Sequence, residues 1–317
     1  MKFKKILTIG VSESSLGSKY WNRLDDLTEK RVSVQKDSAD IKAELKDADC
    51  VLVNPFVFTF EKNLIDEAPL LKYIGVLSTA FGNVDYNHAA AKNIAVCNIP
   101  NYSTEAVAEF AFGSLLDSLR ELERAKTQAK DGNYSEDTFF NTSEIKGKKF
   151  GIIGLGNIGS KMAEIALAFG ADVMYWSKNR KEKLENGGIK YISVEEIVTE
   201  CDIISLNLAF NKDTENFLNA VLILKIKKGA VLINLAPNEL IDLNALEKRL
   251  SNGDITYIMD HSDELTSEQA SELSKHKNCI IYPPIGYTTK EATIEKQEIF
   301  VGNIENFLQG SPTNKVN

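Results

Sequence analysis

The sequence predicts an α/β protein made of two doubly wound domains, each with a parallel sheet. Short apolar runs alternate with amphipathic stretches along the chain, which is typical of repeated βαβ units. The alternation is interrupted near residues 99–101 and resumes after a polar segment at 131–148. With 317 residues, the chain is long enough for two domains of ordinary size.

The first series contains predicted strands at residues 6–9, 49–53, 73–77 and 94–97. The stretch 16–28 has helical spacing and is predicted to be one helix. After the interruption, we expect a single long apolar helix from Ala106 to about Lys130, with Ser103 as its N-cap.

The second series follows the polar segment and is predicted to be inserted within the first. Its strands are expected at residues 150–153, 172–176, 203–208, 230–234, 256–259 and 279–282. The tail, 289–309, is predicted to be one more helix.

The composition of the chain indicates which classes of binding partner are expected. The net charge is -8, and acids and bases are interspersed without a basic face, so no nucleic acid is expected. No apolar run reaches about 18 residues, so no membrane is expected either. The four cysteines lie far apart, which favours reduced thiols in a cytoplasmic protein. The three histidines are scattered, so we expect no metal site.

A glycine-rich turn opens the second series. Gly154-Leu155-Gly156-Asn157-Ile158-Gly159 follows the strand 149–153 and begins a predicted helix at 157–169. Gly154 permits a tight turn, Gly156 lets the backbone approach a pyrophosphate, and Gly159 lets helix and strand pack closely. The helix N-terminus then offers N–H groups to the phosphates. The sequence therefore predicts a dinucleotide site, and both series are interpreted as Rossmann-like.

The end of the next strand indicates which dinucleotide is bound. An acid that bonds the adenosine ribose is expected there, but the position holds Ser177, followed by the bases Lys178 and Arg180. Without a carboxylate, a 2′-phosphate meets no repulsion and can pair with either base. The sequence therefore favours NADP(H), with NAD(H) as the alternative; the bases could also belong to a solvated loop.

The chain resembles the D-2-hydroxyacid dehydrogenases, a group that includes glyoxylate/hydroxypyruvate reductases and glycerate dehydrogenases, over nearly its whole length. The resemblance rests on the glycine turn and on the segments 78–85, 98–100, 106–109, 229–234 and 303–315.

Several expectations about the fold follow from that resemblance. It implies a cofactor domain inserted into a flavodoxin-like substrate domain, here residues 100–283 within 1–99 plus 284–317. It also implies a homodimer, and a small-molecule ligand in the interdomain cleft.

The family's catalytic side chains are replaced in this sequence. In the family an Arg holds the substrate carboxylate, a His donates a proton to the nascent alkoxide, and a Glu tunes that His. The resemblance places Pro237 at the Arg position, Pro284 at the His position and Leu265 at the Glu position. Glu264 would match the Glu only with a one-residue shift. Because proline neither titrates nor holds a carboxylate, ordinary 2-oxoacid reductase activity is not expected.

Other site positions resemble the family more closely. Asp260 matches the acid that bonds the nicotinamide carboxamide, and Ala236 fits beside the ring. Weak catalytic candidates are Tyr287, Glu264 and His261, although alternation along a strand predicts that His261 points away from Asp260. Hydrogen bonds to a small ligand are expected from a substrate loop and its neighbour, which comprise Asn54, Ser78, Thr79, Ala80, Phe81 and Gly82.

Two functions remain open from the sequence. One is an NAD(P)-binding oxidoreductase whose chemistry has moved away from ordinary 2-oxo acids. The other is an inactive NADP(H)-binding pseudoenzyme that acts as a sensor or interaction protein. Both keep dinucleotide binding and differ in whether a substrate is turned over.

Overall fold

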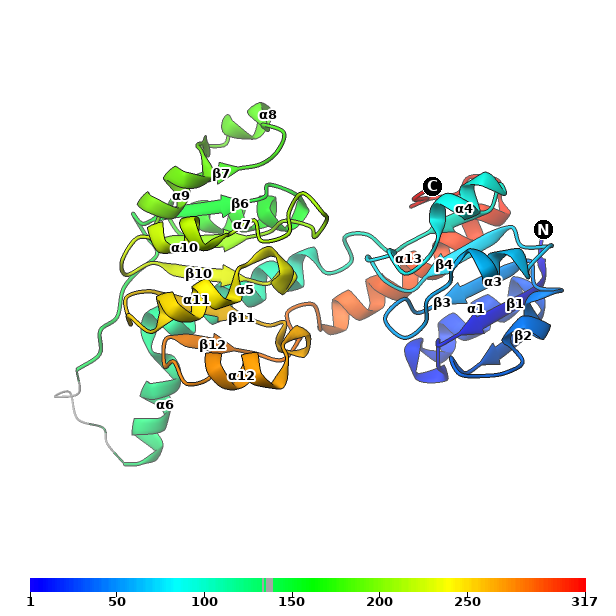
Figure 1. The fold of residues 1–317 in the computed structure, drawn as a ribbon, viewed down its shortest axis with the longest axis horizontal. Coiled ribbons are helices and arrows are strands. Elements are labelled where there is room, and N and C mark those ends of the chain that lie inside the picture. The colour runs from blue at the N-terminus through cyan, green and yellow to red at the C-terminus, as the bar shows by residue number, and fades with distance from the viewer. Residues whose placement is uncertain (133, 135–138) are drawn as a thin grey trace. The chain divides into compact units, whose positions relative to one another are not determined.

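The structure, a computed structural model, describes residues 1–132, 134 and 139–317. It divides into two compact units, which are Met1–Tyr102 with Thr289–Asn317 (unit 1) and Ser103–Thr288 (unit 2). Figure 1 shows the red C-terminal segment packed among the blue elements of unit 1. The predicted fold class, two doubly wound α/β domains, is confirmed.

The units divide a few residues later than the sequence analysis placed the boundaries, which were after residue 99 and before residue 284. The observed divisions follow Tyr102 and Thr288. Residues 284–288 group with unit 2, where the N–H of Gly286 donates to Asp260. Pro284 and Tyr287 therefore belong to the dinucleotide-type unit.

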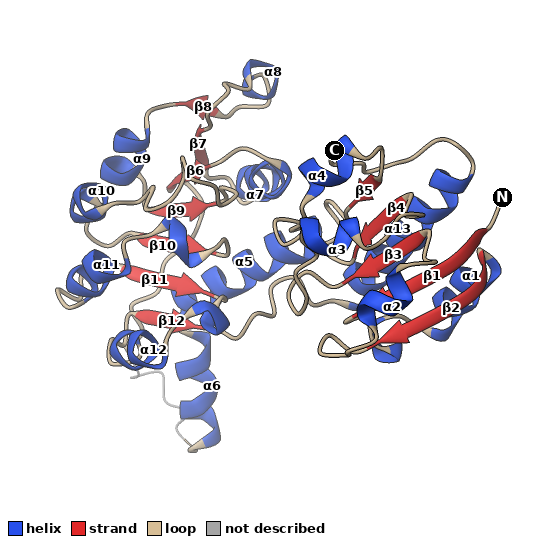
Figure 2. Ribbon diagram, turned by 45° about the vertical axis from the view of Figure 1, so that its right-hand side comes forward, coloured by secondary structure: helices blue, strands red, loops and turns tan. Residues whose placement is uncertain are grey.

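Unit 1 has a five-stranded parallel sheet in the order β2-β1-β3-β4-β5, the flavodoxin-like order. Its strands are β1 (Phe3–Ile9), β2 (Thr28–Val34), β3 (Cys50–Val53), β4 (Tyr73–Val76) and β5 (Ala95–Cys97). One apolar cluster joins the sheet to α1 (Ser18–Asp26) and α13 (Lys290–Leu308). A second cluster joins it to α2 (Ile41–Leu45), α3 (Lys62–Asp66) and α4 (Tyr86–Ala91) (Figure 2). A short 3-10 helix, η1, spans Glu13–Ser15.

β2 was not predicted from the sequence, and the preceding helix was predicted to run too far, to residue 28. The helix ends at Asp26 and β2 starts at Thr28. β2 is an edge strand that pairs only with β1, and most of its residues are exposed or partly exposed. It therefore lacks the apolar run by which the buried strands were recognised.

Unit 2 has a seven-stranded parallel sheet in the order β12-β11-β10-β9-β6-β7-β8. The chain-order direction reverses between β6 and β9, which is where such sheets bind ligands. The strands are β6 (Lys149–Ile153), β7 (Asp172–Trp176), β8 (Lys190–Tyr191), β9 (Ile203–Leu206), β10 (Val231–Asn234), β11 (Thr256–Met259) and β12 (Cys279–Ile281). The two-residue edge strand β8 was not predicted, because it carries no apolar run.

Helices cover both faces of this sheet. Clustered apolar side chains join one face to α5 (Thr104–Arg120) and α7 (Asn157–Ala168). The other face packs against α9 (Val194–Glu200), α10 (Ala220–Lys225), α11 (Leu243–Leu250) and α12 (Ser267–Leu273). Shorter elements complete the unit, and these are α8 (Glu182–Glu185), η2 (Asn238–Leu240) and η3 (Ser262–Glu264).

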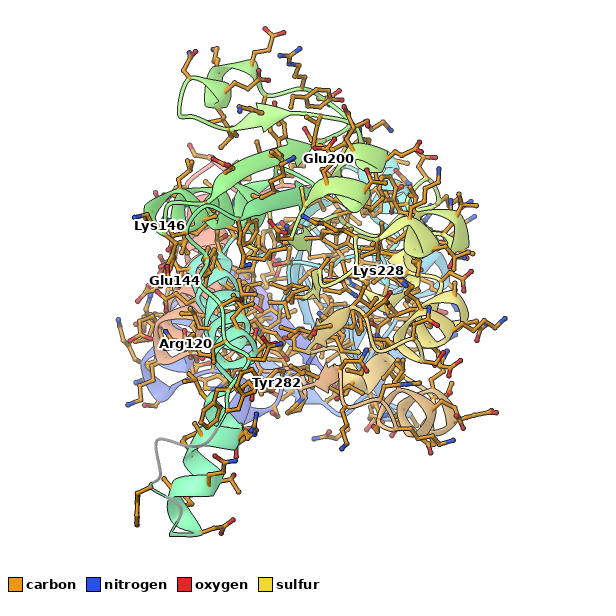
Figure 3. The ribbon with its side chains drawn as sticks, turned by 90° about the vertical axis from the view of Figure 1, so that its left-hand side faces the viewer. Arg120, Glu144, Lys146, Glu200, Lys228 and Tyr282 are labelled. Atoms are coloured by element: carbon orange, nitrogen blue, oxygen red, sulfur yellow. The ribbon has the colours of Figure 1, made fainter. Side chains whose placement is uncertain are left out.

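The single helix predicted over 106–130 is wrong, because the chain forms α5 and then α6 (Leu122–Lys130). Glu121 separates them with a left-handed φ of 50°. The returning chain fixes this break, since the N–H of Asn141 donates to Glu121 Oε1 at 2.9 Å and the N–H of Ser143 donates to the Leu119 carbonyl at 3.0 Å. α6 buries none of its residues, and Figure 3 shows it extending past Arg120 and Tyr282, away from the sheet.

No helix among the described residues combines the length and the apolar character that a membrane crossing requires.

Replacing Gly151 on β6 with alanine is expected to destabilise unit 2. The added Cβ would lie 2.6 Å from Ile197 Cγ2 and 2.8 Å from Cys201 Sγ, where α9 packs on the strand. Overpacking of this kind typically costs about 1–3 kcal/mol of unfolding free energy, which urea denaturation measures. Gly302→Ala on α13 is the control, since nothing lies within 4 Å of its Cβ. Equal stability of the two variants would contradict this packing.

Candidate functional site

The glycine turn after β6 has a backbone that side chains would disrupt. Gly154 has a φ of +100°, and its N–H donates to the Trp176 carbonyl at 2.8 Å. A Cβ on Gly154 would lie 2.7 Å from the carbonyl oxygen of Asn207, which follows β9. The turn is therefore held close to both neighbouring strands, and only glycine fits there.

The other two glycines of the turn differ in their surroundings. A Cβ on Gly159 would lie 2.1 Å from the Gly154 carbonyl oxygen, so this glycine lets α7 approach β6. Gly156 is the exposed N-cap of α7, and nothing lies within 4 Å of its Cβ. Leu155 is buried and Ile158 partly buried, whereas Asn157 is exposed at the first position of the helix. This open cradle is suited to close approach by a phosphate.

The start of α7 carries a partial positive charge that no acid offsets locally. The helix has no acidic residue in its first turn and no side-chain cap on Gly156. Its twelve residues align peptide dipoles toward this end. The cradle therefore favours an anion such as a pyrophosphate.

The end of β7 contains Ser177 and Lys178, which the sequence analysis assigned to the ribose end of the site. Ser177 is buried, and its hydroxyl donates to the Asn179 carbonyl at 2.6 Å. Lys178 pairs with Asp213 at 3.3 Å, and both side chains are largely exposed. This pair is weak because water screens it, so the lysine is available to another anion.

Arg180 is held in place by its neighbours. Its guanidinium donates to both carboxylate oxygens of Glu185, at 2.8 and 2.7 Å, and lies 5.3 Å from the ring centre of Tyr191. The Arg180 bond lowers the pKa of Glu185 to about 2, and Tyr175, whose hydroxyl donates to the same carboxylate, also lowers it. An open hollow of about 480 Å³ adjoins this pair and is lined by Arg180, Lys181, Glu182, Lys183 and Leu184. Three of these five residues are bases and one is an acid.

Asp260 lies just past β11 with an unmet hydrogen bond. The side chain is buried, and its Oδ2 accepts from the N–H of Gly286 at 2.9 Å. Its Oδ1 is buried without a hydrogen-bond partner among the described residues. Burial raises the pKa of this carboxyl group, although the nearby His261 opposes the shift. A buried acceptor without a donor fits the carboxamide of a nicotinamide ring.

His261, Glu264 and Asn238 form a polar cluster beside Asp260. His261 Nδ1 lies 3.2 Å from Glu264 Oε1, and its Nε2 lies 3.7 Å from Asp260 Oδ1. Glu264 Oε2 accepts from the N–H of Asn238 at 2.8 Å, and the Asn238 amide donates to the His261 carbonyl at 2.8 Å. Burial lowers the pKa of His261, but the two carboxylates outweigh it and the net shift is upward. Burial raises the pKa of Glu264, but the His261 and Asn238 bonds outweigh it and the net shift is downward.

The predicted orientation of His261 is wrong. Strand alternation was expected to point it away from Asp260, yet β11 ends at Met259 and alternation no longer applies beyond that residue. Glu264 contacts His261, because η3 turns it back toward that side chain. Asn238 was not predicted, and its place directly after Pro237 was the only signal for it.

The residues that the sequence resemblance assigns to the family's catalytic positions have no titrating group. Pro237 is partly buried and precedes η2, and Pro284 is partly buried after β12. Leu265 packs against the apolar cluster that contains Ala236. Tyr287 is 41% exposed, and no three His, Cys, Asp or Glu side chains in the described ranges could together hold a metal ion.

The predicted substrate loop lies in unit 1, after β4. Ser78 Oγ accepts from the N–H of Ala80 at 3.1 Å, and Thr79 Oγ1 donates to the Ile99 carbonyl at 2.7 Å. Phe81 packs edge-on against Tyr86, and a Cβ on Gly82 would meet nothing within 4 Å.

The neighbouring loop follows β3 and is joined to the substrate loop. Asn54 Oδ1 accepts from the N–H of Phe56 at 3.1 Å. The Asn83 side chain donates to the Pro55 carbonyl at 2.6 Å, and the N–H of Phe60 donates to the Asn83 carbonyl at 2.8 Å. The two loops therefore form one connected edge.

Known proteins are similar to this chain in fold and in sequence. The family model for the D-isomer specific 2-hydroxyacid dehydrogenase NAD binding domain matches residues 112–286. The hydroxypyruvate reductase of Blautia hydrogenotrophica is 31% identical over 287 residues, covering 89% of this chain and 88% of that protein.

Two solved structures extend the likeness to the whole chain. D-lactate dehydrogenase from Aquifex aeolicus, with NAD and lactic acid, has a TM-score of 0.83 and 27% identity over 98% of each chain. An acyclic imino acid reductase with NADPH and D-Arg has a TM-score of 0.84 and 28% identity, covering 99% of this chain and all of that one (100%). The chain therefore belongs to the D-isomer specific 2-hydroxyacid dehydrogenase family.

Proposed function

We propose that the protein is an NADP(H)-binding oxidoreductase whose reaction does not use the family's Arg and His pair. One observation carries this proposal. The glycine cradle and Asp260 Oδ1, which accepts no hydrogen bond, suit a dinucleotide, while the resemblance assigns Pro237 and Pro284 to the catalytic positions. The bound nicotinamide supplies or accepts the hydride. Gly156 would admit the pyrophosphate, the α7 N-terminus would favour its charge, and Asp260 would orient the carboxamide.

The choice of NADP(H) rests on charge at the end of β7. Ser177 occupies the position of the ribose-binding acid, and its hydroxyl bonds within its own loop. Lys178 has only an exposed partner, and Arg180 lines a hollow with two lysines. A 2′-phosphate would meet this positive charge, whereas NAD(H) would gain nothing from it, so NAD(H) is the less favoured cofactor.

The missing proton donor points to a substrate whose reduction consumes no proton from the protein. A 2-oxo acid needs a proton donor, because hydride addition to carbon leaves an alkoxide. A protonated imine is already polarised: hydride adds at carbon and the π electrons become the nitrogen lone pair, giving a neutral amine. The reduced nucleotide leaves oxidised, and no protein proton is consumed. The structural similarity to an imino acid reductase supports a 2-imino acid as the substrate class.

A binding-only role is the second candidate. His261 is the one histidine in the polar cluster, and both of its ring nitrogens face carboxylates. These carboxylates hold the ring in place and interact with its N–H protons. With prolines at the catalytic positions, the protein would bind NADP(H) without turnover and act as a sensor or interaction protein.

We also propose a homodimer. α6 buries no residue, and the segment around it exposes Leu122, Tyr134 and Phe139, at 43%, 82% and 77%. An isolated nine-residue helix is marginal in water, so this one needs a packing partner, and a second copy supplies it.

Gly156→Ala is expected to weaken NADPH binding at least about tenfold without changing thermal stability, since the added methyl meets only open space in the unliganded protein. Titration followed by NADPH fluorescence measures the affinity. Gly113→Ala, also with nothing within 4 Å, is the control. Absence of a saturable signal from the natural protein with both NADPH and NADH would refute dinucleotide binding.

The same titration tests the cofactor preference. NADPH is expected to bind at least about tenfold more tightly than NADH, because a charge-assisted bond is worth roughly 1.5–3 kcal/mol. Ser177→Asp restores the carboxylate and should remove that preference. An unchanged preference in this variant would reject the phosphate pocket.

Turnover separates the enzyme from the binding-only protein. NADPH absorbance should stay constant with glyoxylate or hydroxypyruvate alone, and should fall when ammonium or methylamine is added to form the imine. Rapid consumption with glyoxylate alone would contradict the proposed chemistry. Constant absorbance in every mixture would favour the binding-only role.

The homodimer is tested by light scattering on the eluted protein. The expected mass is about twice the chain mass of 35.2 kDa. Leu122→Glu should shift the mass toward the monomer, whereas Leu184→Glu, which changes another exposed leucine, should not. A monomeric natural protein at all concentrations would exclude the dimer.

A further inference from the structure

The edge strand β5 is covered by the segment 311–317, which follows α13. The strands of this sheet are parallel, whereas the segment runs antiparallel to β5, with Lys315 opposite Cys97. The N–H of Val316 donates to the Val96 carbonyl at 2.9 Å. In Figure 2 the end of the chain marked C lies beside α4 and β5. The segment therefore pairs with backbone groups that an edge strand otherwise leaves open.

Asn317 fixes this segment between β5 and α4. The N–H of Val96 donates to Asn317 Oδ1 at 3.0 Å. The Asn317 side chain in turn donates to the carbonyl of Ile94 at 2.7 Å and to that of Tyr86 at 3.3 Å. Phe81, on the predicted substrate loop, packs edge-on against the ring of Tyr86, with 5.3 Å between the ring centres. Asn317 is therefore connected to the substrate loop through α4.

Asn303 on α13 is buried and joins the segment to the residue that follows β5. Its Oδ1 accepts from the hydroxyl of Thr313 at 2.9 Å and from the side-chain amide of Asn314 at 2.8 Å. Its Nδ2 donates to the Asn98 carbonyl at 2.8 Å, and the N–H of Asn98 donates to the Asn314 carbonyl at 3.2 Å. A buried amide is costly unless its hydrogen bonds are made, so the segment supplies donors that Asn303 needs.

Asn98 extends this connection to the start of the substrate loop. Its buried side chain donates to the Thr79 carbonyl at 2.7 Å. The N–H of Ile99 donates to the Ser78 carbonyl at 2.9 Å, and the Thr79 hydroxyl donates to the Ile99 carbonyl at 2.7 Å. Three hydrogen bonds therefore join the residues after β5 to the loop, and Asn98 also contacts Asn303.

We propose that the segment 311–317 is a strap that holds the substrate loop in its present conformation. Two routes of contact carry this coupling, one through Asn303 to the start of the loop and one through Asn317 to Phe81. Such a network transmits a local change, because the loss of one bond leaves a buried neighbour unsatisfied. All of these contacts lie within unit 1, so the strap depends neither on the dinucleotide nor on a substrate.

Thr313→Val combined with Asn314→Gly tests the first route, because Asn303 Oδ1 then loses both donors. Glycine adopts the left-handed φ of 53° that Asn314 has, so the backbone of the segment is kept. Hydrogen exchange followed by NMR is the measurement. The N–H of Ile99, which donates to Ser78, is expected to exchange about tenfold faster than in the natural protein.

Asn317→Ala tests the second route, since it removes the bonds to β5 and α4. The N–H of Val84, which donates to the Phe81 carbonyl, is expected to exchange about tenfold faster, while that of Ile99 keeps its natural rate. Lys315→Ala is the control on the same segment, because its side chain is exposed and its pairing with β5 is through the backbone. Neither amide should change its exchange rate in the control.

Natural exchange rates at both Ile99 and Val84 in these variants overturn the strap, even where the amides of β5 itself exchange faster. Equal acceleration at the amides of β1, which β3 and β4 separate from β5, shows a general loosening of unit 1 and overturns it as well. Thermal melting establishes whether each variant folds. If the double substitution prevents folding, the rate at Val84 in Asn317→Ala decides the proposal.

Discussion

The backbone contact between Gly154 and Gly159 sets the geometry on which the rest of unit 2 depends. A Cβ added to Gly159 would lie only 2.1 Å from the carbonyl oxygen of Gly154. The helix α7 can therefore approach the turn this closely only because Gly159 has no side chain. Gly154 also lies close to the Asn207 carbonyl, so the two contacts together fix β6, α7 and β9 relative to one another. The helix end, with its partial positive charge, is thereby aimed at the reversal point of the sheet.

Parallel strands bring chemically different side chains to one edge of a sheet. Cofactor binding and catalysis can therefore depend on different residues of the same site. Asp260, His261 and Asn238 all lie at the ends of β10 and β11, and Glu264 contacts both His261 and the N–H of Asn238. Backbone geometry fixes the dinucleotide cradle, whereas the reaction depends on a few replaceable side chains. Under the proposed function, prolines at positions 237 and 284 would alter the chemistry without disturbing the cradle.

The sequence predicted the parts that depend on local sterics and missed those that depend on context. The glycine turn and the buried strands were recognisable, because spacing and apolar runs dictate them. The edge strands β2 and β8 were missed, because their polar residues carry no such pattern. The break at Glu121 and the orientation of His261 arise from contacts with distant chain segments, which no local pattern encodes.

The buried oxygen of Asp260 that accepts no hydrogen bond affects how this carboxyl group holds its proton. Because burial raises its pKa, this carboxyl group favours the fold at low pH, and that contribution is lost as the pH rises through the raised value. A donor placed on Oδ1 would stabilise the charged form and lower the pKa again. Under the proposed function, a nicotinamide carboxamide that donates to Oδ1 would displace a proton from the protonated form of Asp260, so acidification would oppose binding.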